Sequence, residues 1–138
     1  MAFTGMDDAM RKLLSRTDVH KQLGVVIPGT VEFVVPILHD GKLDQIGLVA
    51  ANDPNNNGGT FTCQIENVTQ GTVLVDLAGP ADLHGMGAAT MLDVALDGAN
   101  LALTEGDVIK FTVDVSDGGA SGGDDLAAVI EYSKAVKA

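Results

Sequence analysis

The chain has 138 residues, a common size for one domain and long enough to bury a hydrophobic core. Hydrophobic residues make up 46% of it and aromatic residues only 4%, so the core must consist mainly of aliphatic side chains. The net charge of −11 argues against direct binding of nucleic acid, because an acidic surface repels phosphate groups. The 17 glycines favour an all-β domain with many turns over a helical bundle.

The charge is unevenly distributed along the chain. Residues 1–21 carry four basic and three acidic groups, whereas residues 22–138 carry four basic and sixteen acidic groups. The first residues show no signal-peptide pattern, and no apolar run approaches membrane-spanning length, so we expect no membrane partner. The single cysteine, Cys63, excludes an internal disulfide and alternates with apolar neighbours, which predicts a small buried hydrophobe.

Residues 6–17 are predicted to form a helix, and residues 18–23 a further helical turn. The apolar residues of the helix follow a period of 3.6 residues and form one stripe: Met6, Met10, Leu13 and Leu14. This stripe can pack on the chain's own domain or serve as an arm that docks on a neighbouring subunit. We therefore divide the chain into an N-terminal helical arm, residues 1–24, and a β-sandwich domain, residues 25–138.

From Thr30 onward the apolar period changes to two, which is typical of strands. The segments "TVEFVVPIL" and "LDQIGLVAA" flank Asp40-Gly41, a strong hairpin signal, so they are predicted to pair with each other. Pro36 cannot donate a hydrogen bond to a neighbouring strand, which places the first of these strands at a sheet edge or at a bulge.

Two more strands are expected in the middle of the chain. In "TFTCQIENV", Phe61, Cys63 and Ile65 share one face of a strand. In "TVLVDLA", the same alternation predicts an inward-facing set formed by Val73, Val75 and Leu77.

Three further strands are expected within residues 89–115, with a turn at Asp97-Gly98. The clearest has the buried set Ile109, Phe111, Val113 and Val115. The last segment, residues 124–136, fits either a helix or a strand, and a strand is favoured because it can pair with its predecessor. The pattern predicts a mainly β fold, an antiparallel β-sandwich or jelly roll of about seven or eight strands.

The stretch "NDPNNNGGT", residues 52–60, begins like the calcium loop of an EF-hand, with Asp53, Asn55 and Asn57 in ligand positions. The twelfth position, which needs a bidentate glutamate, is Gln64 on a predicted strand. We therefore interpret the stretch as a turn, with a weak ion site at Asp53 as the alternative.

Other chemical signals are equally incomplete. "GASGG" matches the Gly-x-Ser-x-Gly pattern around Ser121, but all three histidines precede this serine, so a flexible loop is favoured over a nucleophile elbow. Asp117, Asp124 and Asp125 can hold a cation only if their loop folds back, and a solvated loop is favoured. No catalytic set, metal site or cofactor is identified, and we do not expect an enzyme.

The long connection at residues 78–91 carries Leu83, His84 and Met86 among small residues. Long loops in compact domains are often functional. This one either packs against a neighbouring chain or folds over one end of its own domain.

The runs "GTVEFVVP", "MLDVALDGANLALTEGDVIKFTVDV" and "LAAVIEY" resemble small β-sandwich virion proteins of tailed bacteriophages, of the head-fibre or capsid-decoration type. The resemblance covers roughly residues 29–133. It implies a non-enzymatic protein of the virion's capsid surface, made in the host cytoplasm, which decorates or cements the capsid by binding the major capsid protein, often as a homotrimer. The expected contact residues are Met6, Met10, Leu13, Leu14, Leu83, His84 and Met86. The alternative is a carbohydrate- or receptor-binding adhesion module that uses loops 52–60 and 116–125.

Overall fold

The computed structural model describes residues 16–22, 29–51, 55–56, 60–76, 79–83, 86–87, 89–115, 120–121 and 126–134. Within these residues the chain forms strands and one short 3-10 helix, η1 (Gly98–Asn100). The fold is mainly β with two larger antiparallel sheets, arranged as in a β-sandwich, which confirms the predicted class. The predicted N-terminal helix lies outside the described residues, apart from its last two.

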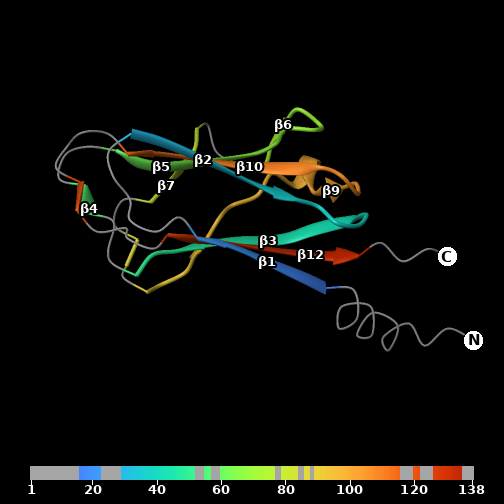
Figure 1. Cartoon of the computed structure of the whole chain (residues 1–138), viewed down its shortest axis with the longest axis horizontal. Helices are drawn as coiled ribbons and strands as arrows, with labels where there is room; N and C mark the ends of the chain where they lie inside the picture. The colour runs from blue at the N-terminus through green and yellow to red at the C-terminus, as the bar shows by residue number, and fades with distance from the viewer. Residues whose placement is uncertain are drawn as a thin grey trace, which may run out of the picture.

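Sheet A contains five strands, in the order β1 (Arg16–Gln22), β12 (Ala127–Lys134), β3 (Gly41–Val49), with β8 (Leu92–Asp93) and β9 (Ala102–Leu103) both on the far side of β3. Sheet B also contains five strands, in the order β2 (Gly29–Pro36), β10 (Val108–Val115) and β5 (Phe61–Asn67). The short strands β6 (Thr72–Val73) and β7 (Ala81–Asp82) both pair with the other edge of β5. A two-stranded sheet C pairs β4 (Asn55–Asn56) with β11 (Ala120–Ser121). In Figure 1, sheets A and B form two layers and sheet C lies beyond one end of them.

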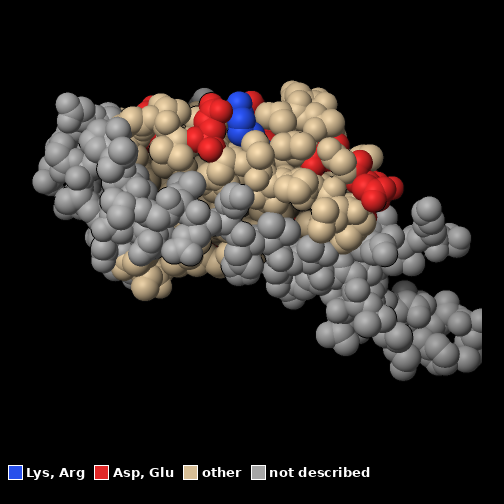
Figure 2. Space-filling view, viewed as in Figure 1, with Lys and Arg blue, Asp and Glu red and all other residues tan. Residues whose placement is uncertain are grey.

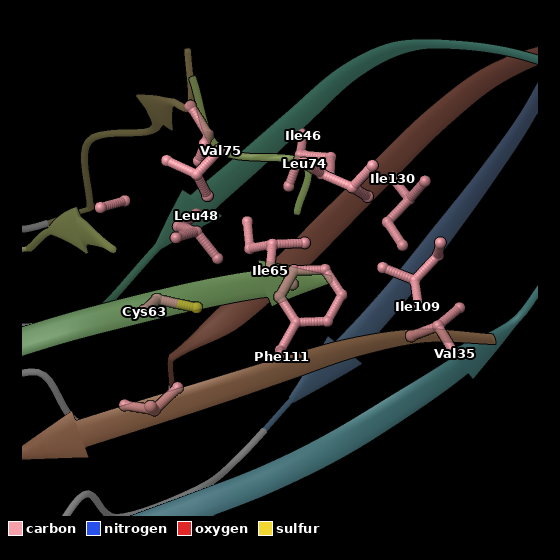
Figure 3. Packing of buried hydrophobic residues seen from close by; sticks show 14 of the residues in the cluster. Val35, Ile46, Leu48, Cys63, Ile65, Leu74, Val75, Ile109, Phe111 and Ile130 are labelled. Carbon is pink, nitrogen blue, oxygen red and sulfur yellow. The ribbon is translucent and has the colours of Figure 1, made fainter. Parts of the chain in front are cut away.

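Alternate residues of both sheets face a shared core, in which the aliphatic side chains of the two layers meet (Figure 3). On β5 the buried set includes Phe61, Cys63 and Ile65, as the alternation predicted. Across β10 and β2 the rings of Phe111 and Phe33 stack, with centroids 4.7 Å apart. Because each strand offers one apolar side chain in two, burial favours a structure of two facing sheets.

The last segment is a strand, β12, with Ala128, Ile130 and Tyr132 buried. The choice of a strand over a helix is therefore confirmed. Its expected partner is wrong: β12 lies between β1 and β3 in sheet A, whereas the preceding long strand, β10, belongs to sheet B.

The predicted hairpin at Asp40-Gly41 is also wrong. β2 pairs with β10, and β3 pairs with β12, so the connection at residues 37–40 carries the chain from one sheet to the other. The physical reason lies in the backbone partners on either side of the turn. Ile37, before the turn, donates its N–H to the carbonyl of Asp107, and Leu43, after the turn, donates its N–H to the carbonyl of Leu101. The segments on the two sides of the turn therefore form hydrogen bonds with different parts of the chain and not with each other.

Two smaller predictions are also corrected. Residues 18–22 of the expected helical turn, and residues 16–17 at the expected end of the helix, are instead part of β1, all seven residues of which pair with β12. Val73, expected to face inward, is 41% exposed, whereas its neighbour Leu74 is buried. The cause is register: Val73 lies opposite Glu66 on the outer face of β5. Val75 is buried as expected, and Leu77 lies outside the described residues.

Candidate functional site

The two loops proposed for adhesion, residues 52–60 and 116–125, meet in sheet C. Asn56 of β4 pairs with Ala120 of β11, and Asn55 pairs with Ser121. Segments that are more than sixty residues apart in sequence are thus brought together at one end of the molecule, which we call the tip (Figure 1). Sequence reasoning proposed both loops but could not show that they are neighbours. Asp53, Asn57, Asp117, Asp124 and Asp125 lie outside the described residues.

The opposite end of the molecule, which we call the base, carries both ends of the described chain. β1 begins at Arg16, which pairs with Ser133, and β12 ends at Lys134, which pairs with Gly41. The connection between β2 and β3 turns at the same end (Figure 1). Acidic side chains gather there in the space-filling view (Figure 2). Asp40 and Glu105 meet there: the backbone N–H of Glu105 donates to Asp40 Oδ1 over 2.8 Å.

A polar network lies buried near the base. Asp107 is 3% exposed, and its Oδ2 accepts hydrogen bonds from Asn67 Nδ2, Gln70 Nε2 and the backbone N–H of Thr104. Burial by itself raises the pKa of this carboxyl group, but the donors outweigh it and leave the pKa of Asp107 below its ordinary value. This carboxylate has little exposed surface, and its three hydrogen bonds connect the turn after β5 to the turn before β10. We therefore interpret Asp107 as a residue that stabilises the fold.

The thiol of Cys63 is fully buried on β5, which confirms the expected small buried hydrophobe. Burial raises the pKa of Cys63 to about 12, because the apolar core disfavours the thiolate. The thiol is therefore unreactive in the folded protein and carries no nucleophilic chemistry.

Of the three candidate contact residues in the 78–91 loop, the structure describes two. Leu83 and Met86 are buried in the core of this chain, as expected if the loop folds over its own domain. His84 lies outside the described residues, as do Met6, Met10, Leu13 and Leu14. Their contact with a partner stays a prediction.

The described residues do not assemble a group of three or more His, Cys, Asp or Glu side chains that could hold a metal ion. Within the same residues, no helix is long and apolar enough to cross a membrane. Of the three histidines, His39 has a described side chain, and its ring lies 4.7 Å from that of Tyr132 at a tilt of 38°. Gln64, the residue at the closing position of the calcium-loop pattern, lies on strand β5.

The outer face of sheet B is a further surface of interest, which was not predicted from the sequence. A row of cross-strand neighbours crosses this face: Val34, Lys110, Glu66 and Val73. The two valines are 49% and 41% exposed, although the residues that follow them in the chain, Val35 and Leu74, are buried. Alternation indicated an outer face on each strand, but only the register of the sheet places these four side chains in one line.

Comparison with known proteins gives no family assignment. No protein-family model matches the sequence, and no curated protein matches it. Any functional proposal therefore depends on the fold and on the positions of the tip and the base.

Proposed function

We propose that the protein is a non-enzymatic structural component of a bacteriophage virion, which decorates or cements the capsid by binding the major capsid protein. The single observation that carries the proposal is the order of strands in the two sheets. Taking β1, β2, β3, β5, β6/β7, β8/β9, β10 and β12 as eight consecutive strands, sheet A has the order 1-8-3-6 and sheet B the order 2-7-4-5. This connectivity supports the assignment of a jelly roll, an architecture that viral capsid and lectin domains share.

The polarity of the molecule supports a decorating role. The described chain begins and ends at the base, and the tip lies at the opposite end (Figure 1). Residues 1–15 precede the base and hold two of the eight basic groups, together with the apolar residues Met6, Met10, Leu13 and Leu14. Attachment through this segment leaves the tip directed away from the attached surface.

Co-sedimentation with capsids tests the proposal. The full chain and a variant without residues 1–15 are incubated with capsids assembled from the major capsid protein encoded with it. The full chain is expected to sediment with capsids to a saturable stoichiometry, and the truncated chain is expected to remain in the supernatant. Residues 16–22 are kept because they form β1.

The matched control removes residues 135–138, which follow the last residue of β12 in the sequence. This variant is expected to bind capsids like the full chain. Failure of the full chain to sediment with capsids at saturating concentration contradicts the proposal. Equal binding of the chain without residues 1–15 contradicts only the role of the N-terminal segment.

A carbohydrate- or receptor-binding adhesion module is the second candidate, and the pairing in sheet C favours it. Loops 52–60 and 116–125 meet at the tip, so they can form one composite surface. A glycan array screened with and without calcium tests this function. Reproducible binding that is lost when β4 and β11 are replaced by glycine-serine linkers supports it, and binding unaffected by that replacement contradicts the assignment to the tip.

A further inference from the structure

We propose that a second copy of this chain packs against the outer face of sheet B, related by a two-fold axis that lies between the copies and runs along the strands. This contact is independent of capsid attachment and of the adhesion module. It also differs from the homotrimer that the resemblance implies. The register of sheet B determines which side chains face each other across such an axis.

The outer face of sheet B has an apolar half toward the base. Val34, Val68 and Val73 are 49%, 42% and 41% exposed, and Pro36 on the same strand as Val34 is also exposed. Val108 lies between Pro36 and Val68, because it pairs with Pro36 on one side and accepts the N–H of Val68 on the other. Exposed apolar side chains that are contiguous on one face are typical of an interaction surface.

The charges in this half are placed at the centre of the row. Lys110 on β10 lies directly beside Glu66 on β5, with Val34 outside the lysine and Val73 outside the glutamate. The row therefore reads apolar, positive, negative, apolar across four strands. Figure 2 shows basic and acidic atoms beside each other on this side of the molecule, among uncharged surface.

Such a row is complementary to itself. A two-fold axis parallel to the strands and midway between β10 and β5 exchanges the two sides of the row. Lys110 of one copy then faces Glu66 of the other, and Val34 faces Val73. Each charge gains an opposite charge across the interface in addition to the one beside it, which offsets part of its desolvation cost.

The rows of cross-strand neighbours on either side of this one also place compatible side chains against each other across the axis. Toward the base, the rotation places Val108 of one copy against Val68 of the other. Toward the tip, Thr112 and Gln64 flank the axis and face each other across it. One row further, Asp114 faces Thr62, and a hydroxyl can donate to a carboxylate.

The outermost positions of that last row are also compatible. Thr30 lies beside Asp114 on β2 and donates its hydroxyl to Asp114 Oδ1, and Asp82 lies beside Thr62 on β7, so the rotation places an uncharged residue, Thr30, against the carboxylate of Asp82. In the rows for which the register defines both partners, no carboxylate faces another carboxylate. This matters in a chain with 19 acidic and 8 basic residues, since an arbitrary contact brings like charges together.

The charges also select the direction of the axis. A two-fold axis perpendicular to the strands, drawn through the central row, places Lys110 opposite itself and Glu66 opposite itself, which is repulsive. The axis along the strands avoids both repulsions. Facing sheets usually cross at about 30°, which tilts the axis by half of that angle and preserves the pairing near its centre.

The symmetry has a consequence for the shape of the dimer. Rotation about an axis along the strands keeps their direction, so both tips lie at one end of the dimer and both bases at the other. The dimer therefore presents two tips side by side. Two copies bound in this way double the number of contacts that a tip can make with one multivalent partner.

Charge reversal tests the contact on the full chain. Light scattering coupled to size exclusion, over a concentration series, is expected to give the wild type twice the mass of one chain. Lys110→Glu and Glu66→Lys are each expected to give the mass of one chain, because each places like charges across the axis. The matched controls Lys42→Glu and Glu105→Lys make the same charge changes at exposed positions outside this face and are expected to stay dimeric.

Mixing provides the sharper result. An equimolar mixture of Lys110→Glu and Glu66→Lys is expected to recover the dimeric mass, because each copy then carries two charges of one sign that face two of the other. The double variant Lys110→Glu/Glu66→Lys is expected to be dimeric alone. Thermal unfolding followed by circular dichroism verifies that each variant is folded.

Four outcomes overturn the proposal. Two concern the wild type: it stays monomeric at every concentration, or it has three times the mass of one chain. The other two concern the variants: the single variants dimerise like the wild type, or their mixture stays monomeric. Capsid co-sedimentation is measured separately with the same variants. Loss of the dimer and loss of capsid binding are therefore distinguished.

Discussion

At the scale of single residues, the most constrained polar group is the carboxylate of Asp107. Its Oδ2 accepts from Asn67, Gln70 and Thr104 over 2.9, 2.6 and 2.9 Å. Asn67 is itself fully buried, and its side-chain oxygen accepts from the backbone N–H of Gln70. Because buried polar groups without partners destabilise a fold, the members of this network depend on one another.

This network predicts a contribution of Asp107 to acid sensitivity. The pKa of Asp107 is lowered in the folded state, so its stabilising contribution is present above the unfolded-state pKa and is lost as the pH falls through the folded-state pKa. Asp107→Asn removes the titrating group while keeping one acceptor oxygen. Urea unfolding between about pH 6 and about pH 2 is expected to show a shallower loss of free energy of unfolding in this variant than in the wild type.

The control for this experiment is Asp93→Asn, which changes an exposed carboxylate on β8. It is expected to retain the acid sensitivity of the wild type. If Asp107→Asn and the wild type lose stability in parallel as the pH falls, the network does not bind the charged form as proposed.

Cys63 allows a second prediction at this scale. Burial raises its pKa from 9.0 to about 12, which lowers the thiolate fraction at neutral pH roughly a thousand-fold. Its fully buried position also blocks approach of a reagent. Ellman's reagent is expected to leave the thiol of the native protein unmodified and to react with one thiol per chain in guanidinium chloride. Prompt reaction under native conditions would show that β5 is not buried as described.

At the scale of elements, the crossing from sheet B to sheet A is made possible by Gly41. A Cβ added at this residue would lie 2.2 Å from the carbonyl oxygen of Ser133 and 3.1 Å from its carbonyl carbon, so β3 and β12 approach too closely for any side chain there. The register of β12 shifts between Glu131 and Tyr132, immediately before this contact. The hydroxyl of Tyr132 accepts the N–H of Leu38 over 3.2 Å and so joins β12 to the crossing connection.

Gly41→Ala is therefore expected to destabilise the protein by about 2–3 kcal/mol, because the clashing atoms belong to the backbone and cannot move aside. The matched control is Gly98→Ala in η1, where an added Cβ meets nothing within 4 Å. This control is expected to change the free energy of unfolding by less than about 0.5 kcal/mol. Chemical denaturation of the two variants measures the difference, and equal stabilities would contradict the close approach.

At the scale of the whole molecule, the N-terminal segment and the sandwich are joined through β1. The arm defined from the sequence, residues 1–24, includes all of β1, which forms one edge of sheet A. Removal of residues 1–15 leaves every described strand in place, whereas removal of residues 1–24 exposes the edge of β12. An exposed strand edge promotes association between chains.

These two truncations are expected to behave differently. The chain without residues 1–15 should keep the melting temperature of the full chain, and the chain without residues 1–24 should melt at a lower temperature and aggregate on heating. Circular dichroism and light scattering during a thermal ramp measure both effects. Equal melting temperatures for the two truncations would show that β1 adds nothing to the stability of sheet A.

Much of the fold was predictable from local patterns, because burial of one face leaves a period of two in the sequence. The buried sets of β5 and β10, the position of Pro36 on an edge strand and the strand character of β12 were predicted in this way. The inward assignment of Val73 failed because "TVLVDLA" contains adjacent apolar residues, and the alternation alone does not choose between them.

Local patterns in the amino-acid sequence therefore establish that the chain is mainly β and which face of its longer strands is buried. The pairing of distant strands in the fold establishes which sheet each strand joins, which loops form the tip and which side chains form the row from Val34 to Val73. The physical reason is that alternation depends on near neighbours in the chain. Pairing depends instead on hydrogen bonds between residues up to more than one hundred positions apart, such as Arg16 and Ser133.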